Sequence, residues 1–117
     1  FMAKSLKNKG KKTWVYQFNR VRDDDLAKKY GAFHGAELPY VFDTHDDWLP
    51  TNNTDKELTE VIQSYWLSFA KTGNPNSADN VIWPEYISSD DSSIVLDGEV
   101  FSRSHESSEI CKIMDLF

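Results

Sequence analysis

The sequence predicts an α/β fold, and three segments carry that prediction. Thr13 to Asn19 is dense in β-branched and aromatic residues and has apolar side chains on both faces, as in a strand of an α/β sheet. Residues 55–72 place their apolar side chains on one helical stripe. Residues 94–98 read as a short strand and turn. A length of 117 residues with 14% aromatic content indicates one ordered domain.

The chain is expected to open with the end of a helix. Residues 1–9 carry lysines suited to a last helical turn, and Gly10 is suited to the C-cap. In the strand that follows, alternation separates two sets of side chains. One face carries the rings of Trp14, Tyr16 and Phe18, and the other carries Val15 and Gln17. Residues 20–50 have little periodicity beyond a short apolar stretch at 38–42, which predicts a long irregular segment of the kind that is usually functional.

The helix at 55–72 has the clearest pattern in the chain. Thr54 and Glu57 are spaced as a capping box at its start, and Gly73 followed by Pro75 ends it. Its apolar stripe consists of Leu58, Val61, Ile62, Tyr65, Trp66 and Phe69. Beyond it, residues 83–86 are expected to be extended or in a turn, and residues 106–117 to form a terminal helix.

Composition excludes several classes of protein. The single cysteine, Cys111, excludes an internal disulfide framework and a cysteine-based zinc cluster, and its place in the terminal helix favours packing. No window approaches 18 consecutive apolar residues, so no membrane span is predicted. No glycine loop for phosphate is present, and no cofactor is predicted.

Charge is distributed unevenly along the chain. Residues 1–22 carry seven Lys or Arg and no acids, whereas the whole chain has a net charge of −6. A basic opening can be a nucleic-acid arm or a solvated helix end. No aromatic platform is interleaved with the lysines, and the acidic remainder would repel phosphate. The sequence therefore favours the solvated end and predicts no nucleic-acid partner.

His34 is the candidate for chemistry. It lies on the long segment after the first strand, flanked by small residues that leave room for a substrate, and its imidazole can exchange a proton near neutral pH. The alternative is a loop histidine bonded to a neighbouring carbonyl. A metal site joining His34 and His45 to Asp43 or Asp46 has no supporting motif spacing. His45 and His105 lie in polar stretches and are expected at the surface.

Several strings, taken in order, carry a family resemblance. They are Val15-Tyr16-Gln17-Phe18, Gly31 to Phe42 (GAFHGAELPYVF), Tyr65-Trp66, Phe69 to Asn76 (FAKTGNPN), Trp83-Pro84-Glu85-Tyr86 and Glu109 to Lys112 (EICK). Together they resemble the C-terminal part of type-B carboxylesterases, the cholinesterase/carboxylesterase family of α/β-hydrolases. The resemblance implies that residues 1–117 are the C-terminal fragment of a carboxylesterase domain: strand, histidine loop, long helix, short strand and terminal helix.

The resemblance also implies roles for individual residues. His34 matches the catalytic histidine of a Ser…Glu/Asp…His triad, which takes the serine proton and then activates water. Glu37 matches a glutamate that braces the loop near the site, and Phe33, Tyr30 and Ala36 match positions that line the substrate pocket. Where the family usually has a glycine after the Val-Phe string, this chain has Asp43.

The implied substrate is a small-molecule carboxylic ester, hydrolysed without a metal or other cofactor. The serine, the oxyanion-hole glycines and the triad acid belong to the upstream part of the same protein, so the fragment alone is expected to be inactive. A non-catalytic protein-interaction module on the same scaffold is the alternative. Such relatives typically lose triad residues, so the intact motif around His34 favours the enzyme. A homo-oligomer of the fragment is expected, because the strand at 13–19 lacks its upstream neighbours.

Overall fold

A three-stranded sheet forms the centre of the described chain. The computed structural model describes residues 2–48, 50–77 and 79–104. Its strands are β1 (Tyr16–Phe18), β2 (Ser93–Leu96) and β3 (Phe101–Arg103), in the order β1-β2-β3. β1 and β2 are parallel, with Tyr16 opposite Ile94, whereas β2 and β3 are antiparallel. A parallel pair needs a crossover, and the long segment between β1 and β2 supplies it.

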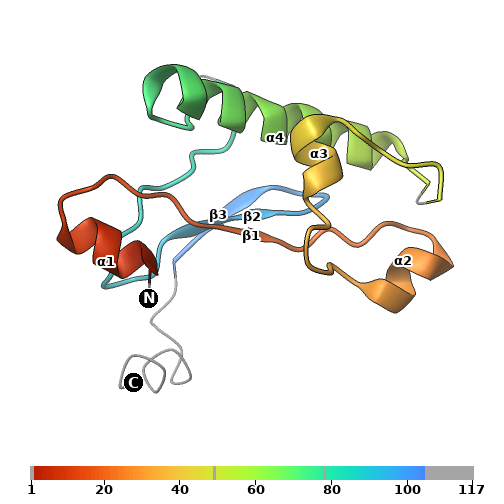
Figure 1. The fold of residues 1–117 in the computed structure, drawn as a ribbon, viewed down its shortest axis with the longest axis horizontal. Helices are drawn as coiled ribbons and strands as arrows, with labels where there is room; N and C mark the ends of the chain where they lie inside the picture. Colours follow the sequence, from red (N-terminus) through yellow and green to blue (C-terminus); the bar gives the residue numbers. More distant parts are fainter. Residues whose placement is uncertain (1, 49, 78, 105–117) are drawn as a thin grey trace.

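The longest helix of that crossover, α4 (Asn53–Thr72), lies across one face of the sheet (Figure 1). Its residues Ile62 and Tyr65 pack with Ile94 and Leu96 of β2 in the hydrophobic core, and all four side chains are fully buried. The helix packs on the sheet because this contact removes its apolar stripe from water. The predicted helix and its stripe are confirmed.

The predicted ring face of the first strand is also confirmed. The Trp14 ring meets Phe69 of α4 at 5.8 Å, and the Tyr16 ring meets Trp66 of α4 at 5.3 Å. The strand is shorter than predicted, because only Tyr16–Phe18 has regular strand geometry. Gln17 on the opposite face is exposed, so the prediction of two covered faces is wrong for β1. All four residues of β2 are buried.

The capping box of α4 differs from the predicted one. The helix begins at Asn53, and Asn52 is the N-cap, whose side chain accepts from the Asp55 N–H while the Asp55 carboxylate accepts from the Asn52 N–H. The observed pair lies two residues before the predicted pair, Thr54 and Glu57. Asn and Asp can form the same two capping bonds as Thr and Glu. Gly73 ends the helix in the left-handed conformation (φ 75°), as predicted.

Residues 20–50 are more ordered than predicted, because they contain two short helices. α2 (Asp25–Tyr30) starts at Asp24, whose side chain accepts from the Ala27 N–H. α3 (Leu38–Phe42) is the apolar stretch noted in the sequence, and it packs against α4. Helices of five and six residues are too short to produce a recognisable period, so tertiary contacts decide them.

The remaining segments before β1 and after α4 are short or irregular. α1 (Met2–Asn8) and the left-handed Gly10 confirm the predicted helix end. Residues 83–86 have no regular structure, as predicted, and the Tyr86 N–H donates to the Thr13 carbonyl. β3 was not predicted, since three residues carry too little pattern. The predicted helix at 106–117, with Cys111, and His105 lie outside the described residues. Over the described residues, no helix combines the length and apolarity that a membrane span requires.

Candidate functional site

His34 lies at the start of a tight turn that joins α2 to α3. The turn spans residues 34–37, and the Leu38 N–H donates to the Gly35 carbonyl at 3.1 Å. Gly35 has φ 83°, which L-residues with side chains rarely adopt, so glycine after the histidine is a conformational requirement. The Tyr40 and Val41 N–H groups both donate to the Glu37 carbonyl, so the turn continues directly into α3. The position of α3 therefore fixes the downstream end of the His34 turn.

The His34 ring is exposed and unengaged. It makes no hydrogen bond or ion pair with any residue of the described ranges. The alternative of a loop histidine bonded to a neighbouring carbonyl is therefore not what the described residues form. A neutral imidazole can accept a hydrogen bond at one nitrogen and donate at the other.

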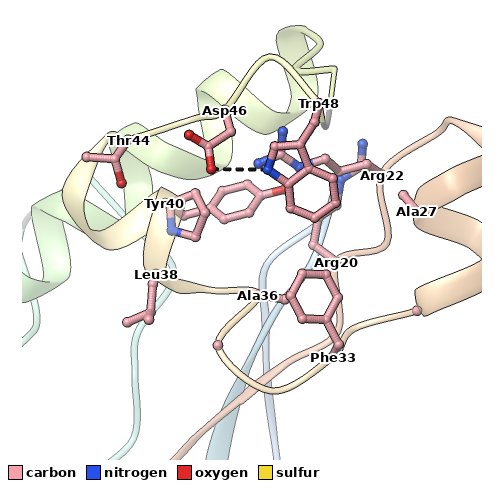
Figure 2. Close-up of a pocket in the computed structure, with 13 residues that line it drawn as sticks. Arg20, Arg22, Ala27, Phe33, Ala36, Leu38, Tyr40, Thr44, Asp46 and Trp48 are labelled. Atoms are coloured by element: carbon pink, nitrogen blue, oxygen red, sulfur yellow. Dashed lines mark hydrogen bonds between the residues drawn. The ribbon is translucent and has the colours of Figure 1, made fainter.

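A pocket of about 290 Å³ lies beside the turn. Phe33 and Ala36, the two residues that flank the His34-Gly35 pair, line it. Figure 2 shows the Phe33 ring and the Trp48 indole on one side of this pocket, and Leu38 and Thr44 on the other. His34 and Tyr30 are not among the lining residues. Tyr30 instead packs its ring edge-on against Phe33, at 6.4 Å between centroids, and so supports one lining residue.

Glu37 faces the sheet from the end of the turn. Its carboxylate accepts from the Tyr16 hydroxyl of β1 at 3.5 Å, at the outer limit of a hydrogen bond. Burial raises the pKa of Tyr16, and the charge and hydrogen bond of Glu37 raise it further. The contact links the histidine turn to the strand that precedes it.

Asp55 is a buried polar side chain with three hydrogen-bond donors, and the sequence analysis did not single it out. Its Oδ1 accepts from Arg20 Nε and from the Tyr40 hydroxyl, each at 2.8 Å, while Oδ2 accepts from the Asn52 N–H at 3.0 Å. Asp55 is fully buried. Burial alone would raise its pKa, but the bonds from Arg20, Asn52 and Tyr40 outweigh burial and lower it. Asp55 is therefore an ionised acceptor that links the start of α4 to Arg20 and to α3.

Two neighbours extend this cluster. Arg20 Nη2 donates to Asp23 Oδ2 at 3.0 Å, and the Asn52 amide donates to the same oxygen. Burial opposes the charge on Arg20, but its hydrogen bonds to Asp55 and Asp23 raise its pKa overall. Burial and the bond to Asp55 raise the pKa of Tyr40 to about 12, which keeps this hydroxyl a donor at neutral pH.

His45 is not the surface residue that the sequence predicted. It is partly buried, and its ring meets Tyr40 edge-on at 5.0 Å. Arg22 Nη2 lies 2.7 Å from Nδ1, and since a guanidinium only donates, Nδ1 accepts. Nε2 then carries the proton and donates to Thr59 Oγ1 at 2.9 Å, and Thr59 donates to the Asp55 carbonyl. The contacts require a neutral ring, and burial followed by the Arg22 charge lowers the pKa of His45.

The described residues do not form the metal site considered for His34 and His45 with Asp43 or Asp46. In the part of the chain that is described, no group of three or more His, Cys, Asp or Glu side chains is arranged to hold a metal ion. Both nitrogens of His45 are occupied by Arg22 and Thr59.

Comparison with known proteins decides the family. The model of the carboxylesterase family matches residues 1–112. The chain belongs to the carboxylesterase family. Para-nitrobenzyl esterase of Bacillus subtilis is 38% identical over 101 residues, which cover 82% of this chain and 20% of that protein. Carboxylesterase 4A of Bos taurus is 32% identical over 81 residues, covering 68% of this chain and 15% of that protein.

Solved carboxylesterases share the arrangement of helices and strands. A thermophilic PNB esterase structure matches with a TM-score of 0.75 and 33% identity, covering 92% of this chain and 22% of that one. A second PNB esterase structure matches with a TM-score of 0.73 and 36% identity, covering 92% and 21%. The α/β arrangement is thus part of an α/β-hydrolase fold. The chain spans about a fifth of the length of these carboxylesterase relatives.

Proposed function

We propose that this chain is the histidine-bearing C-terminal part of a serine carboxylesterase, with His34 as the general base. The observation that carries the proposal is the state of His34: an exposed, unengaged imidazole on a turn held at its downstream end, beside a pocket lined by Phe33 and Ala36. Membership of the carboxylesterase family supports the reaction class. The relatives' names include a para-nitrobenzyl esterase and a carboxylesterase.

The proposed reaction has two stages, and His34 moves a proton in each. The serine and the triad acid come from the upstream part of the protein. His34 takes the serine proton as the oxygen attacks the ester carbonyl, and returns it to the departing alcohol, leaving an acylated serine. Water then attacks the acyl group, His34 takes its proton, and the serine regains a proton as the carboxylic acid leaves.

The surrounding residues have supporting roles in this proposal. Phe33 and Ala36 give the pocket an apolar wall, suited to a hydrocarbon part of the ester. Tyr30 supports the Phe33 ring, and Glu37 braces the turn through the hydroxyl of Tyr16. The residues that carry this chemistry need no metal or organic cofactor.

The test uses the protein with its natural upstream sequence and a short-chain aryl ester. His34→Ala is expected to lower kcat by at least about 10³-fold, because the nucleophile loses its base. The free energy of unfolding is expected to stay within about 0.5 kcal/mol, since the ring is exposed. Lys29→Ala is the matched control, because it removes another exposed side chain, from α2, and should leave kcat within twofold of wild type.

Retention of most of the activity in His34→Ala would contradict the proposal. An upstream sequence with no serine at the expected Gly-x-Ser-x-Gly elbow would also contradict it, and would favour a non-catalytic interaction module on this scaffold. Residues 1–117 alone are expected to hydrolyse no ester above the buffer rate.

A further inference from the structure

Asp55, in the first turn of α4, joins the cap of its own helix to two segments that are distant in the sequence. Arg20 follows β1, Tyr40 is in α3, and Asn52 caps α4, and all three donate to the Asp55 carboxylate. A carboxylate can accept several bonds, whereas an amide in its place would turn an N–H group toward one of these donors. Asp55, Arg20 and Tyr40 are buried, so an imperfect arrangement of their polar groups carries a high energetic cost.

Tyr40 is the member of this cluster that reaches the His34 turn. It follows Glu37 by three residues, and its N–H donates to the Glu37 carbonyl at 3.0 Å. Its side chain is almost fully buried, with its ring against Phe18 of β1 at 5.1 Å and against His45 at 5.0 Å. The hydroxyl bond to Asp55 is directional, whereas the ring contacts tolerate sliding. The bond therefore fixes where α3, and the turn before it, lies relative to α4.

We propose that Asp55 and Tyr40 act as positioning residues for His34. The proposal rests on the proposed function, because it assigns these residues a part in aligning the general base. A base that must meet a serine supplied by another part of the chain depends on this alignment, since a displacement of about 1 Å can cost as much as 10²-fold in rate. Neither residue touches the substrate or the reacting atoms in this account.

The test is Tyr40→Phe in the full-length protein, with Tyr65→Phe as the matched control. Tyr65 is also fully buried, also has a pKa raised by burial to about 12, and donates its hydroxyl to the Val81 carbonyl at 2.6 Å. Each variant loses one buried tyrosine hydroxyl bond and keeps its ring. The two differ in location, because Tyr65 lies further along α4 and has no bond to the turn.

Tyr40→Phe is expected to lower kcat about tenfold with KM within twofold of wild type, because alignment of the base matters to the chemical step. Both variants are expected to lower Tm by a similar amount, because each loses one buried tyrosine hydroxyl bond. Tyr65→Phe is expected to leave kcat within twofold of wild type. Equal loss of kcat in both variants, or full kcat in Tyr40→Phe, would overturn the positioning role. His34→Ala is measured in parallel. If it keeps its activity, the proposed function fails; if it is inactive while Tyr40→Phe has full kcat, only the positioning role fails.

Discussion

At the scale of single residues, Asp55 matters more to the fold than its place in a helix would suggest. Its side chain is buried with Arg20 as its ionic partner, while Asp23, the second carboxylate on Arg20, is 68% exposed. An ion pair taken out of water is costly to break from one side, because the remaining charge stays buried and unpaired. An exposed pair is screened by water and contributes little.

This contrast gives a prediction for stability. Asp55→Ala is expected to lower the free energy of unfolding by about 3–5 kcal/mol, because Arg20 loses its buried partner and Tyr40 its acceptor. Asp23→Ala is expected to lower it far less, because water screens the exposed Arg20–Asp23 pair. Urea unfolding of both variants and the wild type measures the difference. Equal losses in the two variants would show that Arg20 does not distinguish the buried carboxylate from the exposed one.

At the scale of elements, α3 and the segment after it are held to α4 by His45. The ring accepts from Arg22 at one nitrogen and donates to Thr59 of α4 at the other. A proton added at Nδ1 would face the Arg22 guanidinium and break the first bond. The lowered pKa of His45, caused by burial and by the Arg22 charge, has a consequence for stability.

The folded pKa of His45 lies below the ordinary value of 6.5, so below about pH 6.5 the unfolded chain takes up a proton that the folded chain does not. The stability that His45 contributes is therefore full above this pH and is lost as the pH falls through the folded pKa. Urea unfolding between about pH 5 and pH 7.5 measures it, with His45→Gln as the control. The wild type is expected to lose more stability toward low pH than the variant. If the stability of the wild type and of the variant falls in parallel with pH, the neutral His45 ring with a hydrogen bond at each nitrogen is contradicted.

The elements that the sequence predicted correctly are those with a long or dense pattern. α4 was recognisable because six apolar side chains share one stripe, and β1 because large rings alternate along it. The helices α2 and α3 were missed because one turn and a half of helix shows no periodicity. Asp43, at the position where the resemblance predicts glycine, ends α3 in the left-handed conformation (φ 51°).

The candidate site could be predicted only in part. His34 was predicted from its motif, and of the three residues predicted to line a substrate pocket, Phe33 and Ala36 line the cavity beside the turn and Tyr30 does not. The roles of Asp55, Arg20 and His45 depend on contacts between residues 14 to 35 positions apart, which no local pattern encodes. A buried carboxylate at the third position of a helix is read locally as a cap, and only the fold adds its other partners.

At the scale of the whole molecule, β1 is at one edge of the sheet formed by the described strands. Residues 1–117 alone are therefore expected to form a dimer or swapped oligomer, with an interface around strand 13–19 and the predicted helix at 106–117. Sedimentation equilibrium at micromolar concentration measures the mass. A compact, cooperatively unfolding monomer would contradict this expectation and show that the edge needs no neighbour.

The most direct test of the central claim is a crystal structure of the full-length protein with its nucleophilic serine blocked by an aryl phosphonate. The account predicts that the His34 ring lies within about 3.2 Å of the serine oxygen, with the Tyr40–Asp55 bond intact behind it. A structure in which another histidine occupies that position, with the His34 ring turned to solvent away from the serine, would contradict the account.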